Sequence, residues 1–293
     1  MYEILEKREL AENIFLMEIF APRVARSALP GQFVIARACP EGERIPLTVS
    51  DYDAERGTVQ IVIQTVGVST LKLCALGRGD SLTDFAGPLG RPSDFTAEST
   101  ESLKGRRMLF IAGGVGTAPV YPQVKWLRER GIAADVIIGA KTKNLLILTD
   151  EMRRVAENLY IATDDGTEGF KGMVTGLFKE LVEGGHRYDT VVTIGPMIMM
   201  KFVALATKEY GIHTIASLNS LMVDGTGMCG ACRVSVGGRT MFTCVDGPEF
   251  DAHAVDFDEA MRRSGQYRPQ EQRALDEYRR AEEGHKCKIG LDK

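Results

Sequence analysis

The sequence has no excess of positive charge. Its 293 residues include 36 basic and 40 acidic side chains, which gives a formal net charge of −4. Proteins that bind nucleic acid neutralise the phosphate backbone with a basic surface. The composition therefore argues against a nucleic-acid partner.

Long hydrophobic runs are also absent. The most apolar stretch, residues 191–206, is interrupted by Gly195, Pro196 and Lys201 and is too short to cross a bilayer. The first residues have neither the basic start nor the apolar core of a signal peptide. We therefore expect no membrane partner and a cytoplasmic location.

Cysteine is scarce, and half of it lies in one short stretch. Three of the six cysteines fall between residues 229 and 244, whereas Cys39, Cys74 and Cys287 are scattered. Small secreted domains stabilised by disulfides show many more cysteines for their length. The pattern is typical of a reduced, cytosolic protein, and the chain is long enough for two domains with their own cores.

A glycine-rich loop, DGTGMCGAC at residues 224–232, carries the most informative pattern of the chain. The aspartate and the cysteines of this loop become negatively charged when they ionise, and at such short separations they would repel one another without a cation between them. Glycines let the backbone turn tightly and point N–H groups inward. Alternating apolar residues after the loop predict a hairpin that brings one more cysteine back to it. The predicted metal ligands are Asp224, Cys229, Cys232 and Cys244.

Two kinds of metal site fit these ligands. Thiolate-rich sites favour zinc or an iron–sulfur cluster. The ligands are separated by four, two and eleven residues, which resembles the plant-type pattern for a [2Fe–2S] cluster with Asp224 in place of the first cysteine. A structural zinc site with three cysteines and one aspartate is the alternative. We favour the cluster because zinc ribbons usually have two CxxC motifs and this chain has one.

Residues 1–100 are predicted to form a β domain. Short apolar runs recur with turn signals between them, and the even spacing without a helical period indicates an antiparallel barrel or sandwich. One short helix is expected at residues 69–76. The predicted strands cover residues 14–19, 32–36, 47–50, 58–64 and 80–84.

Residues 101–218 change to alternating strands and helices, which is typical of a parallel sheet covered on both faces. Residues 219–255 form the predicted cluster-binding segment, and residues 256–293 form a charged tail that we expect to be helical. The predicted strands of the second domain are 107–112, 134–139, 159–163 and 190–194, and its helices begin near 120 and cover 151–156, 175–183 and 197–209.

Three turns follow predicted strands of this domain and lie at the same edge of the sheet. Ligands of open parallel sheets bind at that edge, and a helix N-terminus after a glycine turn attracts phosphate. Glycine turns also occur without a nucleotide, and the first turn departs from the GxGxxG pattern, but three together favour a nucleotide site. The candidate contacts are Gly113, Gly114, Gly116, Thr117, Ala118, Asp164, Asp165, Gly195, Pro196 and Met197.

The order of a β domain, the GGVGTAP, TDDG and GPM turns, and a cysteine loop closed by TCVDGPEF resembles the ferredoxin-reductase superfamily. The resemblance covers about residues 1–255. It implies an N-terminal antiparallel Greek-key β-barrel that binds FAD and an α/β parallel-sheet domain that binds NAD(H). A small [2Fe–2S] loop with a hairpin and a C-terminal helix would follow.

The same resemblance implies flavin contacts in the barrel. Residues 45–48 match the RxYS flavin motif, although Ile45 and Leu47 replace its arginine and tyrosine and Arg44 stands one residue early. Residues 62–64 match the strand beside the flavin, and residues 67–70 match the turn at the FAD pyrophosphate. The candidate residues are Arg44, Ile45, Pro46, Leu47, Thr48, Val62, Ile63, Gln64, Gly67, Ser69 and Thr70.

Two groups of electron-transfer subunits are most similar. One belongs to the electron-bifurcating NADH-dependent ferredoxin:NADP oxidoreductases, also called the sulfide dehydrogenase β subunit, and the other to type B dihydroorotate dehydrogenases. Asp224 favours the first, because the second uses four cysteines. This resemblance implies a larger partner subunit with FAD and [4Fe–4S] clusters, which exchanges electrons with ferredoxin, so that ferredoxin is an indirect partner.

The implied function is an oxidoreductase subunit that passes electrons between NAD(H), FAD and a [2Fe–2S] cluster. A hydride carries two electrons together and a cluster accepts one at a time, so the flavin must stand between them. No catalytic acid, base or nucleophile is expected in this chain. Two alternatives stay open: the dihydroorotate-linked subunit, and a nucleotide-binding protein with a structural zinc site.

Overall fold

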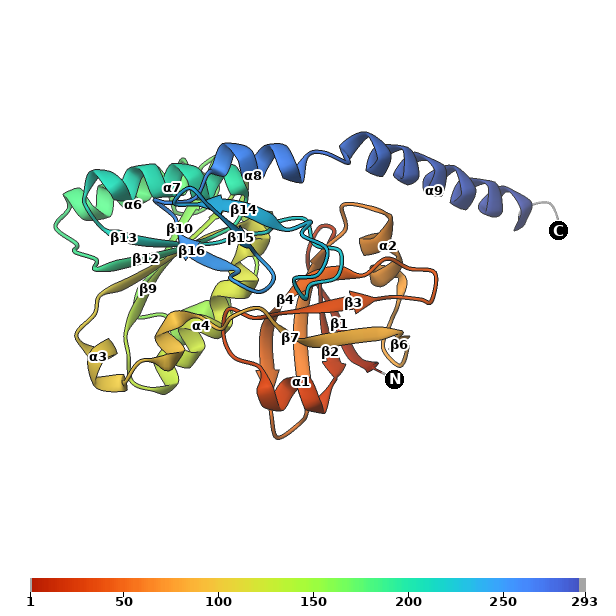
Figure 1. Cartoon of the computed structure of the whole chain (residues 1–293), viewed down its shortest axis with the longest axis horizontal. Helices are drawn as coiled ribbons and strands as arrows, with labels where there is room; N and C mark the ends of the chain where they lie inside the picture. Colours follow the sequence, from red (N-terminus) through yellow and green to blue (C-terminus); the bar gives the residue numbers. More distant parts are fainter. Residues whose placement is uncertain (1, 290–293) are drawn as a thin grey trace.

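The structure is a computed structural model that describes the backbone of residues 2–289 and the side chains of residues 2–281. Within the described residues the strands form two seven-stranded sheets and one two-stranded hairpin. Figure 1 shows the first sheet and the second sheet side by side, with a long C-terminal helix that extends away from both.

The first sheet is antiparallel and has the order β6-β1-β2-β5-β4-β3-β7. Strand β2 pairs with β5 rather than with β3, so the chain follows a Greek-key path, and the predicted barrel is confirmed. Two short helices, α1 (Pro22–Ser27) and α2 (Val68–Ala75), belong to this domain. The strands are β1 (Tyr2–Ala11), β2 (Ile14–Phe20), β3 (Phe33–Arg37), β4 (Ile45–Asp53), β5 (Thr58–Gln64), β6 (Ser81–Leu82) and β7 (Asp84–Leu89).

A single apolar core fills this sheet. Ile4, Met17, Ile61 and Phe85 have no more than 1% of their surface exposed and lie on four different strands. Because such side chains must leave water together, their contact curls the sheet around them and stabilises the barrel.

The second sheet has the order β11-β10-β9-β8-β12-β13-β16 and is parallel except for β16 at its edge. This confirms the predicted nucleotide-domain architecture. The strands are β8 (Met108–Gly113), β9 (Ala134–Ala140), β10 (Leu159–Thr163), β11 (Phe170–Lys171), β12 (Thr190–Ile194), β13 (His213–Ser217) and β16 (Glu249–Asp251). The helices are α3 (Thr100–Lys104), α4 (Thr117–Glu129), α5 (Thr149–Val155), α6 (Val174–Glu183) and α7 (Met197–Glu209).

Helices cover both faces of this sheet because its strands are apolar on both sides. Along β8, Phe110 packs in one core with α4 and α5. Its neighbour Ile111 points to the opposite face and packs with α6 and α7. Alternate side chains of this one strand therefore belong to two hydrophobic cores, one on each face of the sheet.

Several elements were not expected from the sequence. Strand β1, helix α1 and strand β13 were not predicted, and the strand expected at residues 80–84 is divided between β6 and β7. Strand β16 lies within the segment 219–255, yet it completes the sheet of the nucleotide domain by pairing with β13. The prediction of only one short helix in the β domain was wrong, because α1 and α2 both lie there.

The cluster-binding segment is compact. Strands β14 (Arg233–Val236) and β15 (Arg239–Phe242) form the predicted hairpin between Cys232 and Cys244. The tail forms α8 (Phe257–Ser264), which packs beside α7 through Phe257 and Ala260, and then α9 (Arg268–Ile289). Figure 1 shows α9 leading away from the sheets.

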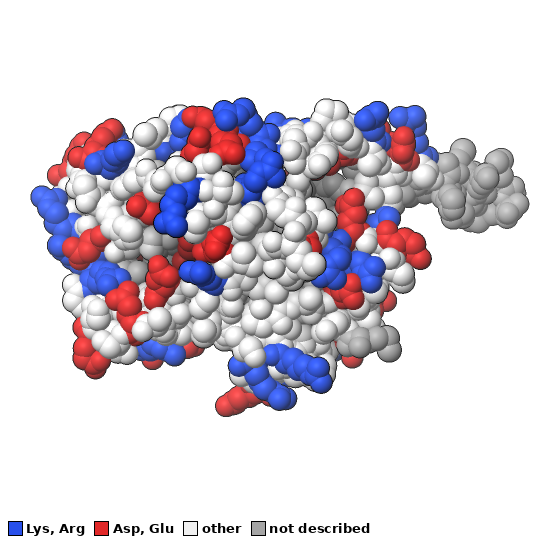
Figure 2. Space-filling model, in the orientation of Figure 1, with Lys and Arg blue, Asp and Glu red and all other residues white. Residues whose placement is uncertain are grey.

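The surface carries both signs of charge. On the face shown in Figure 2, basic and acidic side chains are interspersed rather than gathered into a basic band. Among the described helices none is long and apolar enough to span a bilayer.

Phe178 provides a test of the core beneath α6. It is fully buried between β8, β9 and the helix pair α6–α7, so Phe178→Ala should destabilise the protein by about 3–5 kcal/mol. Phe202→Ala on α7 is a matched control, since that ring is 52% exposed, and should change the free energy of unfolding by less than about 1 kcal/mol. Chemical denaturation followed by circular dichroism measures both. Equal effects would contradict the assigned core.

Candidate functional site

The predicted flavin motif lies on β4, where it pairs with β3. Thr48 lies opposite Phe33, and Ile45 lies opposite Ala36. Residues 45–48 are all partly exposed, whereas the following Val49 is buried in the barrel core. The motif is thus at the place where β4 emerges from the core, and it is accessible to a ligand.

The residues predicted on β5 divide between two environments. Ile63 is fully buried in the barrel core, and Gln64 at the strand end is exposed. Val62 is buried in a small cluster that also contains Ala118 and Leu148 of the nucleotide domain. Val62 and Ala118, both predicted cofactor residues, therefore hold the two domains together at the candidate site.

Arg44 makes an ion pair within the barrel. One of its guanidinium nitrogens lies 3.2 Å from a carboxylate oxygen of Asp84, and Arg37 contacts the same oxygen at 2.8 Å. About 39% of the Arg44 side chain remains exposed. The arginine is consequently oriented by Asp84 but still accessible from solvent.

The turn before α2 has the form of an anion site. The Thr70 hydroxyl accepts hydrogen bonds from the backbone N–H groups of Val66 and Gly67 and donates to the Gly67 carbonyl oxygen. The Ser69 hydroxyl donates to the Glu43 carboxylate. A side chain at Gly67 would point into open space, so the helix N-terminus is open to an approaching phosphate.

Close packing requires glycine at two positions of the first turn of the nucleotide domain. A Cβ at Gly116 would lie 2.2 Å from the carbonyl oxygen of Ile194, and one at Gly113 would lie 2.3 Å from the sulfur of Met199. Glycine at these positions lets the ends of β8 and β12 approach each other. Gly114 differs, because its φ is +55° and the space around its Cα is open. The turn thus presents an open backbone towards a ligand.

The second turn follows β10. Asp164 and Asp165 are exposed there, and Thr167 donates its backbone N–H and its hydroxyl to the Asp165 carboxylate at 3.0 and 2.7 Å. These hydrogen bonds, led by that of the hydroxyl, lower the pKa of Asp165. A negative charge is therefore fixed at the carboxyl edge of the sheet.

The third turn starts α7. Pro196 is exposed at the helix start, whereas the side chain of Met197 is buried with Met200 and Phe250 in a core beneath the helix. The three turns follow β8, β10 and β12, which are parallel, so they share one edge of the sheet as predicted.

The predicted metal ligands form two pairs. The Cys229 thiol lies 3.0 Å from a carboxylate oxygen of Asp224, and the sulfurs of Cys232 and Cys244 are 3.2 Å apart. No group of three such side chains converges on one point among residues 2–281. In a two-iron cluster each iron takes two protein ligands, so two pairs fit a [2Fe–2S] cluster better than a single tetrahedral zinc ion.

The two ligand pairs differ in burial and in their protonation. Cys232 and Cys244 are 2% and 1% exposed, and burial, followed by the adjacent Cys232 thiol, raises the pKa of Cys244 to about 12. The hydrogen bond of the Cys229 thiol, together with that of the Thr226 hydroxyl, lowers the pKa of Asp224. A bound metal ion would convert the thiols to thiolates.

The cluster loop packs directly on the barrel. Cys232 and Cys244 share an apolar cluster with Phe33 and Ile35 of β3. Because β3 is the neighbour of the flavin motif in β4, the buried ligand pair lies one strand away from that motif, and neighbouring strands are about 5 Å apart. The predicted flavin motif and the buried cysteine pair therefore lie on neighbouring parts of the barrel.

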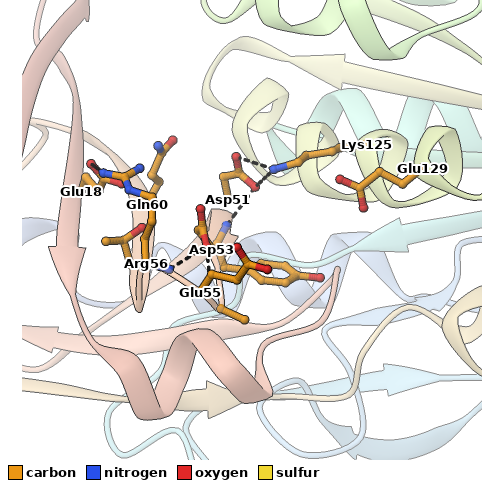
Figure 3. Close-up of a pocket in the computed structure, with 11 residues that line it drawn as sticks. Glu18, Asp51, Asp53, Glu55, Arg56, Gln60, Lys125 and Glu129 are labelled. Carbon is orange, nitrogen blue, oxygen red and sulfur yellow. Dashed lines mark hydrogen bonds and ion pairs between the residues drawn. The ribbon is translucent and has the colours of Figure 1, made fainter.

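A separate cavity of about 360 Å³ lies between the barrel and α4. Figure 3 shows Lys125 of α4 reaching Asp51 of β4, which it contacts at 2.8 Å, and Arg56 facing Glu18. The cavity contains none of the predicted cofactor residues, and its two basic side chains, Arg56 and Lys125, are both in ion pairs. It is a contact between the domains, outside the candidate site.

Sequence reasoning missed one buried polar group near the site. The carboxyl group of Glu249 on β16 accepts hydrogen bonds from Ser93 and Gln123. The residue is part of the TCVDGPEF stretch that closes the cysteine loop. Strand β16 reads Glu-Phe-Asp, with a charged residue on each side of one apolar residue, so no signal in the sequence sets Glu249 apart.

Together the flavin strand, the nucleotide edge and the cysteine loop define an electron-transfer oxidoreductase subunit of ferredoxin-reductase type. Residues 219–256 match the family model described as the iron-sulfur cluster binding domain of dihydroorotate dehydrogenase B. A dihydroorotate dehydrogenase B (NAD(+)) electron transfer subunit homolog of Thermotoga maritima is 44% identical, over 92% of each chain. The chain belongs to the family of these electron transfer subunits and their homologues.

Two further proteins are similar over nearly the whole chain. A protein of Clostridium beijerinckii, described as an uncharacterized protein in the adh 3′ region, is 58% identical over 94% of this chain and 93% of its own. A solved structure of an NADH-dependent reduced ferredoxin-NADP oxidoreductase, studied for flavin-based electron bifurcation, contains a chain that is 42% identical. The match covers 95% of this chain and 98% of that chain, with a TM-score of 0.87.

These findings confirm the predicted class and its cofactors. The chain is an oxidoreductase subunit that transfers electrons, with FAD, NAD(H) and a [2Fe–2S] cluster as the cofactors of its fold and family. The iron–sulfur family match disfavours the structural zinc alternative. As an electron-transfer subunit, it works together with a further subunit.

Gly116 offers a test of the nucleotide edge. Gly116→Ala would place a Cβ against the Ile194 carbonyl oxygen, and the strand ends would have to separate at a cost of roughly 1–3 kcal/mol. We expect weaker NADH binding with unchanged FAD content, measured by titration and by absorbance. Gly105→Ala, at the end of α3 with open space around it and a φ of −86°, is the control for a glycine replacement. Unchanged NADH affinity in the Gly116 variant would contradict this role.

Proposed function

We propose that the chain is the small subunit of a cytoplasmic NADH-dependent ferredoxin:NADP oxidoreductase that bifurcates electrons. In this assembly it passes electrons between NAD(H), FAD and its [2Fe–2S] cluster to a larger flavoprotein with FAD and [4Fe–4S] clusters. Ferredoxin exchanges electrons with that larger subunit. The observation that carries the proposal is Asp224, paired with Cys229 at the position where the dihydroorotate-linked subunits have a fourth cysteine.

The barrel is the proposed FAD site. Thr48 and its neighbours on β4 would lie along the flavin, and the α2 N-terminus near Gly67 would receive the pyrophosphate. Arg44, oriented by Asp84, is a proposed pyrophosphate partner. The support for these roles is exposure: residues 45–48 and the turn before α2 are accessible, whereas Val49, Leu73 and Cys74 beside them are buried.

The carboxyl edge of the parallel sheet is the proposed NAD(H) site. The open backbone at Gly114 and the N-terminus of α4 provide N–H groups and a positive helix end for the diphosphate. Asp164 and Asp165 provide acceptors for hydroxyl groups. The cluster of Val62, Ala118 and Leu148 keeps this edge fixed against the flavin strand.

The proposed iron ligands follow the observed pairs. Asp224 and Cys229 would bind one iron, and Cys232 and Cys244 the other. When bound, FAD supplies the chemistry that the chain lacks, because it accepts a hydride and gives up electrons singly to a one-electron acceptor. The side chains described here orient the groups and set their surroundings.

A second candidate shares the same site. The 44% identity to a dihydroorotate dehydrogenase B electron transfer subunit homolog favours a dihydroorotate-linked subunit. Both candidates predict the same cofactors and differ in the partner. The identity of the partner subunit therefore decides between them.

Partner identification is the direct experiment. We expect the affinity-tagged full chain, isolated without oxygen from its native cell, to bring down a larger iron–sulfur flavoprotein that oxidises or reduces NADP(H). Mass spectrometry identifies the partner, and ferredoxin reduction by the complex checks the activity. A dihydroorotate dehydrogenase catalytic subunit in its place would replace this proposal by the second candidate.

Substitution of the ligands tests the cluster. Cys229→Ser should lose most of the iron and the visible absorbance of the cluster, because serine is a poor ligand for iron–sulfur clusters. Asp224→Cys should retain a cluster with a shifted reduction potential. Iron analysis and visible spectra before and after addition of NADH measure both effects.

Cys39→Ser supplies the matched control, since Cys39 is a partly buried cysteine of the barrel outside the loop. That variant should keep its full iron content. If Cys229→Ser also kept its iron, the proposed ligand set would be wrong.

A further inference from the structure

Three parts of the molecule meet at the side chain of Glu249. Glu249 begins β16 and pairs with Ser217 of β13 at the edge of the nucleotide sheet. It follows the cysteine loop by five residues, counted from Cys244. Although the residue keeps some exposure, its carboxyl group points inward against the barrel and α4.

The carboxyl group is held from both neighbouring domains. Ser93, which follows the last barrel strand, donates its hydroxyl to Oε1 of Glu249 at 2.9 Å. Gln123 of α4 donates its amide N–H to the same oxygen at 3.1 Å. Both donors are fully buried, and they lie 156 and 126 residues away in sequence. One oxygen thus ties the cluster segment to the barrel and to the nucleotide domain.

The amide of Gln123 shows which form of the acid fits. Its oxygen Oε1 is buried and has no hydrogen-bond partner among the described residues. A carboxylate has only acceptors, whereas a neutral carboxylic acid has an O–H that can donate to an amide oxygen. A protonated Glu249 would therefore satisfy the unpaired oxygen of Gln123 while still accepting from its N–H group.

The electrostatics agree with a neutral acid. The pKa of Glu249 is raised from 4.5 to about 7, chiefly by burial and also by the negative charge of Asp94. The hydrogen bonds from Ser93 and Gln123 act in the opposite direction and are weaker. Among the groups that pack on the carboxyl, Asp94 carries the charge, and Ser93 and Gln123 are neutral.

The same joint holds the segment that follows Cys244. The backbone N–H of Arg91 donates to the Gly247 carbonyl at 2.7 Å, and its Nε donates to the Val245 carbonyl at 3.2 Å. Residues 245–249 are therefore fixed to the barrel at both ends, by Arg91 near Cys244 and by Ser93 at Glu249. The position of the buried cysteine pair depends on this attachment.

We propose that Glu249 is a positioning residue, held as a neutral carboxylic acid against the Gln123 amide, which fixes the cluster segment on the barrel and on α4. The inference rests on the proposed role of Cys244 as an iron ligand. Loss of the joint, or ionisation of Glu249, would loosen the loop and slow electron transfer to the cluster without removing a ligand.

The direction of the pH effect follows from the raised pKa. In the unfolded chain Glu249 loses its proton near pH 4.5, but in the folded chain it keeps the proton up to about pH 7. Between these values the folded state binds more protons, so the stability contribution of Glu249 falls as pH rises. Above about pH 7 a buried carboxylate lies beside Asp94, and the joint is weakened.

Glu249→Gln is the decisive variant, because glutamine keeps the acceptor oxygen and always has a donor for Gln123. In the full chain loaded with FAD and iron, we expect the wild type to lose melting temperature relative to Glu249→Gln between about pH 4.5 and about pH 7. The rate of NADH-driven cluster reduction should fall in the wild type around pH 7, where Glu249 of the folded chain ionises, and stay level in the variant. An equal pH profile of both quantities in both proteins would overturn the proposal.

Two further variants separate positioning from folding. Ser93→Ala, which removes the barrel-side donor, and Glu249→Ala should each slow cluster reduction, the latter roughly tenfold, with FAD and iron contents unchanged. Glu101→Gln on α3, an exposed carboxyl that makes no contact with Glu249, Ser93 or Gln123 among the hydrogen bonds above, should match the wild type. If Glu249→Ala fails to fold, Ser93→Ala and Glu249→Gln still decide.

The controls also separate the two levels of inference. Absence of iron from the wild-type chain itself would refute the proposed cluster ligands before any variant is compared. Suppose instead that the wild type has its normal iron content, that Ser93→Ala reduces the cluster at the wild-type rate, and that Glu249→Gln has the pH profiles of the wild type. These outcomes together would refute only the role of Glu249.

Discussion

The contact between the cysteine loop and strand β3 is the interaction on which the rest of the structure depends. Cys232 and Cys244 are buried against Phe33 and Ile35, and β3 in turn pairs with the flavin motif on β4. Electron transfer falls off steeply with distance, so a relay needs its groups held within a short and constant separation. Here the strand with the predicted flavin motif and the buried cysteine pair are held together by the hydrogen bonds of one strand pair and by one apolar cluster.

A second constraint comes from the glycines at the ends of β8 and β12. The backbone at Gly116 touches the carbonyl of Ile194, and no larger residue fits between them. This close approach brings the nucleotide turns to one edge of the sheet. The contact of Val62 in the barrel with Ala118 and Leu148 attaches that edge to the barrel. The nucleotide, flavin and cluster regions are therefore positioned by packing, and the exposed polar residues around them are free to serve recognition.

Much of this architecture could be predicted because its signals are local. The cysteine loop, the glycine turns and β12 are encoded within a few consecutive residues, and the structure has them at the expected places. Strand β1 was missed because its sequence, YEILEKRELA, is half charged and resembles a solvated segment. Glu249 could not be found at all, since its meaning depends on Ser93 and Gln123, which only the folded topology brings to it. Local chemistry is readable from sequence, whereas joints between domains are not.

The two ligand pairs are buried to different extents, so the cluster loop has an inner and an outer side. Cys232 and Cys244 are enclosed on the barrel side, whereas Cys229 is exposed and is preceded by apolar side chains that face solvent. Met228 is 88% exposed and Val223 is 56% exposed, which is costly for a loop that faces only water. An apolar rim around the exposed ligands is the composition expected of a surface that a second subunit covers. The loop thus has an inner side that packs on the barrel and an outer side with the composition of a protein contact, as a relay between two subunits requires.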